Sequence, residues 1–215
     1  MNHMKSTTYI SSGRFIDALP VGRAPAVPYA REMSELDDSA LMLQYRDGDT
    51  AAFEVLYRRH NDALYRYLLR LSLDSAVAED VFQEAWGKII RARSGYRPTA
   101  KFSTYLFRVA HNCFIDYLRR NRRHAHSGAI DPDQTESEAE SPDDLTERAM
   151  ARRRLEAGLA TLPEEQRDAF LLYEEAGLSI DDIAKVTDVN RETAKSRLRY
   201  AVRKLRAALA DGETV

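Results

Sequence analysis

Positive charge is concentrated in the last helical stretch of the chain. The segment VNRETAKSRLRYAVRKLRAAL (189–209) holds seven Lys and Arg residues, although the formal net charge of all 215 residues is only −2. An α-helix turns by about 100° per residue, so the apolar residues of this segment form one narrow stripe that must pack inward. The opposite, basic face is either solvated or shaped to lie against a negatively charged partner. The inward stripe consists of Ala194, Leu198, Ala201 and Leu205.

The side chains on the basic face suit contact with duplex DNA. Lys195 and Arg199 can donate to guanine O6 and N7, and Ser196 can contact a base or a phosphate. Arg203 lies further along and suits a phosphate contact. The candidate residues for duplex DNA are Arg191, Lys195, Ser196, Arg199, Tyr200 and Arg203.

The segment GLSIDDIAKVTD (177–188) predicts how the basic helix is positioned. Ser179 with Asp182 forms a capping-box pattern that opens a short helix, and Asn190 caps the basic helix. A short helix, a turn and a longer basic helix make a helix-turn-helix. In that motif the first helix crosses the phosphate backbone, and the amino-terminal part of the second enters the major groove.

A second basic helix is predicted from FSTYLFRVAHNCFIDYLRRNRR (102–123). Its periodicity turns Cys113 inward and leaves a strip of Arg and Asn residues outward. Together with the aromatic residues Tyr96, Tyr105 and Phe107, this strip suits nucleic acid with unpaired bases. Core aromatics and a basic helix end that interacts with its own dipole explain the same pattern, so the residues alone leave both interpretations open. The candidates are Tyr105, Arg108, Asn112, Arg119, Arg122 and Arg123.

A third segment, AEDVFQEAWGKII (78–90), predicts a helix with an acidic outer face. Val81, Phe82 and Ile89 can pack inward at helical spacing. The acidic side chains then remain accessible, which by itself is typical of a solvated surface. The accessible residues are Glu79, Asp80, Gln83 and, further round, Glu84.

The elements that position these residues are all helical, because no stretch alternates apolar and polar residues as a strand does. We expect an all-α chain of two small helical domains joined by a flexible acidic linker. The linker composition cannot bury enough apolar surface to offset its ordering entropy. The predicted divisions are a flexible extension at 1–36, a first domain at 37–123, the linker at 124–147 and a helix-turn-helix domain at 148–210.

Four helices are expected in each domain. In the first, Asp38 or Ser39 caps a helix that Gly48 ends, and Ser103 or Thr104 caps the last helix. In the second, Pro163 opens the second helix. The remaining helices are expected to start at Thr50, Ser75 and Leu145, after Ser179, and after Asn190.

Taken together, the three segments resemble a bacterial sigma factor of the small, extracytoplasmic-function type in the sigma-70 family. Segment 78–90 resembles the helix with which that family binds core polymerase, and 102–123 resembles its promoter-melting helix. Segment 159–206, with its T-x-K-S-R-L core, resembles its upstream-element domain. The resemblance covers residues 38–123 and 148–209 in the family's order.

The resemblance implies a protein that binds core RNA polymerase and directs it to promoters. It assigns duplex recognition of a −35 element to the basic helix of the second domain, and single-strand capture of a −10 element to the first. It also implies an anti-sigma factor as a further partner. The residues that it places against a basic coiled coil of the largest polymerase subunit are Glu79, Asp80, Gln83, Glu84 and Trp86.

Other classes of protein are less well supported. A stand-alone helix-turn-helix regulator is the alternative, but it leaves the acidic helix without a role. His111, Cys113, His124 and His126 suggest a metal site, yet Cys113 points inward while His111 points outward, so we expect neither metal nor cofactor and no enzyme activity. One cysteine excludes an intrachain disulfide, and no long apolar run predicts a membrane span or signal peptide. We therefore expect a cytoplasmic protein.

Overall fold

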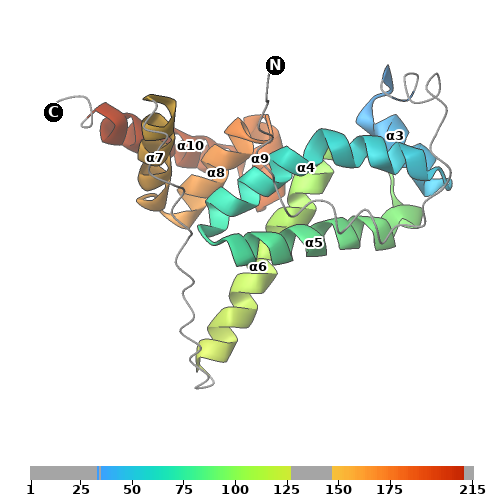
Figure 1. Ribbon diagram of the computed structural model, residues 1–215, viewed down its shortest axis with the longest axis horizontal. Coiled ribbons are helices and arrows are strands. Elements are labelled where there is room, and N and C mark those ends of the chain that lie inside the picture. Colours follow the sequence, from blue (N-terminus) through green and yellow to red (C-terminus); the bar gives the residue numbers. More distant parts are fainter. Residues whose placement is uncertain (1–32, 34, 127–146, 211–215) are drawn as a thin grey trace, which may run out of the picture.

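The computed structural model describes residues 33, 35–126 and 147–210, with side chains described except at 124–126, 147–149 and 210. Within these ranges every regular element is a helix, which confirms the predicted all-α class. The amino-terminal module comprises α3 to α6 and the carboxyl-terminal module comprises α7 to α10 (Figure 1). Their bounds are α3 Asp38–Arg46, α4 Thr50–Ser72, α5 Ser75–Ala92, the short 3₁₀ helix η1 Arg93–Gly95, α6 Phe102–His126, α7 Glu147–Ala160, α8 Glu164–Glu174, α9 Ile180–Thr187 and α10 Arg191–Ala210.

The amino-terminal module is held by an aromatic core between α3, α4 and α5. Trp86 is fully buried, and its ring lies edge-on to Phe53 with centroids 5.6 Å apart. Tyr57 packs against the same indole at 5.1 Å. Buried aromatic side chains of this size supply much of the apolar area that stabilises a small helical module.

Aspartate side chains begin three of the helices. Asp37 Oδ1 accepts from Ala40 N–H at 2.9 Å, so Asp37 is the cap of α3, and not Asp38 or Ser39 as expected. Asp49 and Asp74 cap α4 and α5 in the same way. Asp38 instead turns back to the side chains of α4, where its carboxylate lies 2.8 Å from His60 Nε2.

Two further boundaries depart from the sequence prediction. The α6 helix begins at Phe102, before the expected caps Ser103 and Thr104, and it runs to His126, three residues into the predicted linker. Met33, near the end of the predicted extension, is 2% exposed in the core. Residues 1–32 of that extension and residues 127–146 of the linker lie outside the described residues.

The carboxyl-terminal module packs α10 against α7, α8 and α9. Gly177 ends the α8 region with a φ of +61°, a conformation that glycine adopts without steric cost. Gly158 of α7 lies against α10, where an added Cβ would stand 3.1 Å from Leu205. A small residue at this position therefore lets α7 approach α10 closely.

The two modules are in contact, a feature that sequence reasoning left out. Helices α8 and α9 lie against α4 and α6 (Figure 1). The Tyr67 hydroxyl donates to Asp168 Oδ1 at 2.8 Å, and both side chains are buried. At the edge of the interface, Arg66 and Arg70 both pair with Glu175. The carboxyl-terminal half of α6 extends away from the bundle (Figure 1).

Candidate nucleic-acid interface

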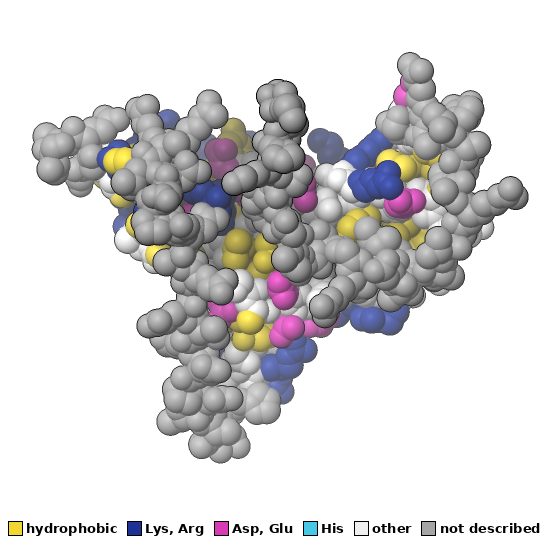
Figure 2. All heavy atoms as spheres, viewed as in Figure 1, with side chains coloured by type: hydrophobic (Ala, Val, Ile, Leu, Met, Phe, Trp, Pro, Cys, Tyr) yellow, Lys and Arg dark blue, Asp and Glu magenta, His cyan; other side chains and the backbone are white. Residues whose placement is uncertain are grey.

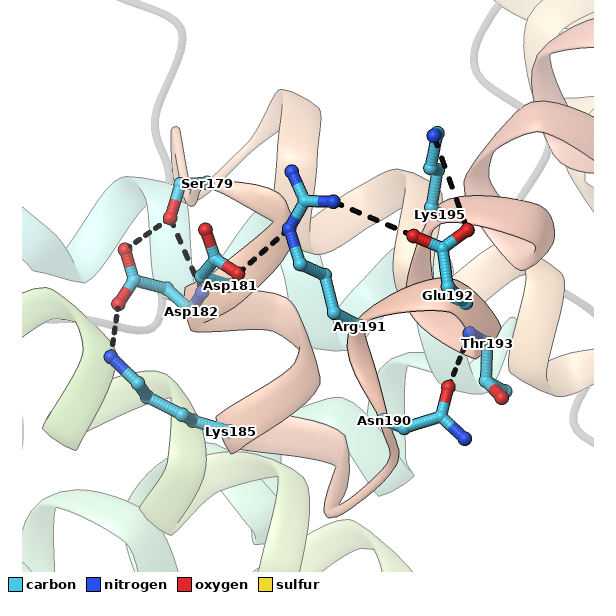
Figure 3. A network of polar contacts seen from close by, with 9 residues as sticks. All are labelled: Ser179, Asp181, Asp182, Lys185, Asn190, Arg191, Glu192, Thr193 and Lys195. Atoms are coloured by element: carbon cyan, nitrogen blue, oxygen red, sulfur yellow. Dashed lines mark hydrogen bonds and ion pairs between the residues drawn. The ribbon is translucent and has the colours of Figure 1, made fainter.

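The predicted helix-turn-helix is present, with both helix caps confirmed. The Ser179 hydroxyl donates to the Asp182 carboxylate at 2.6 Å and accepts from Asp182 N–H at 3.2 Å. This hydrogen bond and the nearby Lys185 lower the pKa of Asp182 against the effect of burial. Asp188 closes the turn in the left-handed region at φ +53°. Asn190 Oδ1 then accepts from Thr193 N–H at 2.8 Å and starts α10 (Figure 3).

The α10 helix has the two faces that its periodicity predicts. Ala194, Ala201 and Leu205 are buried and Leu198 is partly buried, so the apolar stripe packs inward. The exposed basic side chains on the other face are those of Arg191, Lys195, Arg199 and Arg203.

Tyr200 organises part of the basic face. Its ring is 39% exposed, and the guanidinium carbons of Arg199 and Arg203 lie 5.2 and 4.9 Å from the ring centroid. Cation–π contacts of this kind hold two flexible arginines near one aromatic plane. The three residues thus form a preordered cationic patch on the exposed face.

Two of the candidate cations are already paired with acidic residues. Arg191 Nε lies 3.0 Å from Asp181 Oδ1, and Arg191 Nη1 lies 3.5 Å from Glu192 Oε1 (Figure 3). The Glu192 carboxylate also lies 4.0 Å from Lys195 Nζ. Exposed ion pairs contribute about 0–1 kcal/mol, so DNA phosphates can replace them. Sequence reasoning missed Asp181 and Glu192 as partners, although an acid at i,i+3 from Lys195 is a visible signal.

Ser196 is held by the backbone of its own helix. Its hydroxyl donates to the carbonyl oxygens of Glu192 at 2.9 Å and of Thr193 at 3.0 Å. Its oxygen therefore remains available as an acceptor, while donation to DNA requires the loss of these contacts.

The outer strip of α6 is exposed as predicted. Arg108, Asn112, Arg119, Arg122 and Arg123 all have exposed side chains. Figure 2 shows Lys and Arg side chains gathered on the projecting part of α6 beside acidic ones. The Arg119 Nη1 atom lies 3.6 Å from Asp116 Oδ1 on the same helix.

The aromatic residues near α6 divide between surface and core. Tyr96 is 5% and Phe107 is 1% exposed, so the expectation that they are spare stacking surfaces is wrong, and both belong to the core. Tyr105 is only partly buried and borders a hollow of about 560 Å³ between α5 and α6. Lys88, Arg91 and Asn112 line the same hollow, so cationic, amide and aromatic groups meet there.

The acidic face of α5 is only partly as expected. Asp80 and Gln83 are exposed and Glu79 is partly exposed. Glu84 lies 3.1 Å from both Lys88 and Arg120. Burial raises the pKa of Glu84, but the hydrogen bonds and positive charges of these two side chains together lower it. Trp86 has no exposed surface, so its inclusion in a polymerase-binding surface is wrong, because the indole fills the module core.

Of the residues that suggested a metal site, Cys113 and His111 lie on different sides of α6. Cys113 is buried, and burial raises the pKa of its thiol. His111 points away from the core of its own module, as predicted, and lies in the interface between the modules. Its Nδ1 atom is 3.1 Å from Asp168 Oδ2, but the two atoms are not aligned for a hydrogen bond. Among the residues whose side chains are described, no group of three or more His, Cys, Asp or Glu residues could hold a metal ion. The side chains of His124 and His126 lie outside the described set.

None of the described helices is long and apolar enough to cross a membrane.

Each module matches a family model. Residues 56–124 match Sigma-70 region 2, and residues 152–205 match Sigma-70, region 4. The chain is 31% identical to the RNA polymerase sigma factor CarQ of Myxococcus xanthus, covering 80% of this chain and 97% of that protein. It is also 31% identical to the ECF RNA polymerase sigma factor SigM of Mycobacterium tuberculosis, with 85% and 89% covered. For the ECF RNA polymerase sigma-E factor of Escherichia coli the identity is again 31%, with 77% and 91% covered.

Two solved structures share the fold. One is the sigma factor RpoE in complex with the anti-sigma factor NepR from Bartonella quintana, with a TM-score of 0.59 and coverage of 74% of this chain and 96% of that one. The other is CnrH in complex with the cytosolic domain of CnrY, with a TM-score of 0.60 and coverage of 81% and 97%. At 24% sequence identity, each supports the fold alone.

Proposed function

This chain belongs to the extracytoplasmic-function group of the sigma-70 family, and we propose on that premise that it binds core RNA polymerase, recognises −35 and −10 promoter elements and stabilises the melted −10 strand. As a sigma factor it is a transcription initiation factor and not an enzyme. The observation that carries the proposal is the exposed basic face of α10 at the end of a capped helix-turn-helix.

The upstream element is assigned to the carboxyl-terminal module. The amino-terminal turns of α10 enter the major groove of duplex DNA, and α9 crosses its phosphate backbone. Lys195 and Arg199 donate to guanine edges, while Arg203 pairs with phosphate. The Tyr200 ring keeps both arginines close to the exposed face before DNA arrives.

The downstream element is assigned to the amino-terminal module as a single strand. The exposed arginines of α6 neutralise phosphates, and Tyr105 with Asn112 offers a stacking surface and an amide beside the hollow. The segment between Arg93 and Phe102, at the start of α6, receives an unstacked base. Unstacking costs a few kcal/mol per base, and stacking on an aromatic returns about 1–3 kcal/mol. Binding energy of this size supports melting without a chemical energy source.

The polymerase contact is assigned to the exposed side chains of α5. Asp80 and Gln83, with the partly exposed Glu79 and Glu84, face a basic coiled coil of the largest polymerase subunit. Opposite charges there speed association and orient the complex. Of the two solved structures of the same fold, the sigma factor RpoE is bound to the anti-sigma factor NepR, and CnrH is bound to the cytosolic domain of CnrY. By analogy with RpoE, we infer an anti-sigma factor as a partner of this chain. A protein with these partners acts in the cytoplasm.

Reconstitution with purified core polymerase tests the proposal. We expect a one-to-one complex on gel filtration and transcripts from promoters that share two elements. Arg119→Ala is expected to weaken binding to single-stranded −10 DNA severalfold, while Arg58→Ala, which changes an exposed arginine of α4, leaves it unchanged. A chain that forms no complex with core polymerase contradicts the proposal.

A further inference from the structure

The Glu192 carboxylate occupies an unusual place for a DNA-binding surface. It lies in the first turn of α10, with its side chain 75% exposed, and it stands between Arg191 and Lys195 (Figure 3). Lys195 and Ser196 follow within about one helical turn. The acid therefore lies within the part of the helix that a helix-turn-helix presents to the major groove.

A carboxylate in that position restricts what it can contact. DNA phosphates repel it, so a favourable contact must come from a hydrogen-bond donor on a base edge. In the major groove, cytosine presents only its N4 amino donor, whereas adenine presents N6 beside the N7 acceptor and guanine presents two acceptors. An acceptor-only side chain such as glutamate therefore fits cytosine best.

The neighbouring cations make such an approach feasible. Arg191 and Lys195 partly neutralise the Glu192 charge in the free protein. When DNA binds, both can turn to phosphate or guanine acceptors while the carboxylate turns to the base edge. Residues three apart on a helix have Cβ atoms about 5–6 Å apart, and neighbouring base pairs are about 3.4 Å apart, so the two long side chains can converge on adjacent base pairs.

We propose that Glu192 selects a cytosine in the upstream element by accepting from its N4 amino group, and that Lys195 contacts a guanine on the neighbouring base pair. This inference rests on the proposed function, because it needs duplex recognition by α10. It goes further by naming the residue that sets one base preference.

A purely structural role for Glu192 has a different signature. An acid in the first turn stabilises a helix through its dipole, and its loss then lowers stability and changes affinity for every sequence alike. A base-reading role instead changes which sequence is preferred. Thermal unfolding of each variant separates a loss of folding from a change in recognition.

The experiment selects promoters from a library with a randomised upstream element, using the holoenzyme formed with the full chain. The wild type is expected to enrich a C·G pair next to a G·C pair. Glutamine pairs with adenine through N6 and N7, so Glu192→Gln is expected to shift that position from cytosine to adenine. Glu192→Ala is expected to reduce the preference for cytosine by about tenfold.

Asp181→Asn is the matched control, because Asp181 is also an exposed acid paired with Arg191 but lies on α9. It is expected to raise affinity for all duplexes without changing the enriched sequence. The inference is overturned if Glu192→Gln behaves like this control. If the wild-type holoenzyme enriches no upstream element, the proposed function fails at this module and the inference fails with it.

Discussion

At the scale of one residue, we propose that the contact between Arg199 and Tyr200 prepares a surface cation for DNA recognition. A free arginine side chain loses conformational entropy when it binds DNA. Here Tyr200 holds the guanidinium of Arg199 at 5.2 Å and that of Arg203 at 4.9 Å. Part of that entropy is lost on folding, so less is lost at the promoter.

Replacing Arg199 tests this role directly. Arg199→Ala removes a donor that pairs with guanine, so we expect affinity for the upstream element to fall by about tenfold and selectivity to relax at one base pair. Lys204→Ala removes a charge from a different side of the same helix and is expected to cause a smaller, sequence-independent loss. Fluorescence anisotropy with matched and mutated duplexes provides both values. Equal losses on every duplex would show that Arg199 contacts only phosphate.

Two variants of α5, at Trp86 and at Asp80, can separate an effect on folding from an effect on partner binding. Because its indole is fully buried against Phe53 and Tyr57, Trp86→Ala is expected to reduce the free energy of unfolding by about 3–5 kcal/mol. Asp80→Asn changes an exposed side chain of the same helix, so we expect little change in stability but slower association with polymerase. Denaturant unfolding and stopped-flow binding measure the two effects. A stable Trp86→Ala variant would contradict the core assignment.

At the scale of the element, the Ser179 cap fixes the start of α9, the helix that precedes α10 in the helix-turn-helix. Ser179 satisfies the backbone at the start of α9, and its hydroxyl also stabilises the Asp182 carboxylate. An eight-residue helix has few internal hydrogen bonds. Its position therefore depends on the cap and on the packing of Ile183 and Val186.

Removing this cap has a pH-dependent effect. Ser179→Ala is expected to cost about 1 kcal/mol of stability at neutral pH. The folded pKa of Asp182 is lowered, first by Ser179, so the part of the stabilisation that comes from the carboxylate is complete above the ordinary carboxyl pKa of 3.8 and is lost as the pH falls through the lower folded pKa. The hydrogen bond from Asp182 N–H to Ser179 does not titrate, so the advantage of the wild type should narrow at low pH and not vanish. Thermal unfolding over this acidic range, with the exposed Ser94→Ala as control, measures the difference; a gap that does not narrow contradicts it.

At the scale of the whole molecule, the contact between the modules bears on the proposed binding to two promoter elements. Helix α9 packs on α6, so the modules that carry the two proposed DNA-reading surfaces are in direct contact. The −35 and −10 elements are separated by more than two helical turns of duplex, each about 34 Å long. We therefore expect the modules to separate when the holoenzyme binds a promoter.

The interface is held by few polar contacts, so it can be weakened selectively. Tyr67→Phe combined with Glu175→Gln removes the buried hydrogen bond to Asp168 and both arginine pairs. We expect a larger radius of gyration in small-angle X-ray scattering, with unchanged helix content by circular dichroism. Glu174→Gln, at the exposed neighbouring position, is the control. An unchanged radius would mean that apolar packing and the remaining contact between His111 and Asp168 hold the modules together.

Local features of the chain were readable from its sequence. Helix periodicity placed Ala194, Ala201 and Leu205 inward, and the cap motifs at Ser179 and Asn190 formed as expected. These features depend on residues within four positions of each other, so the sequence by itself determines them.

Only the tertiary structure decided that Trp86, Tyr96 and Phe107 are buried. It also decided that His111 lies against Asp168 of the other module. Asp168 reaches Tyr67 across 101 residues of chain, and no periodicity specifies which surface covers an outward helix face. A helix pattern tells which side chains share a face. Only the packing of distant elements determines whether that face meets solvent, a partner or the chain itself.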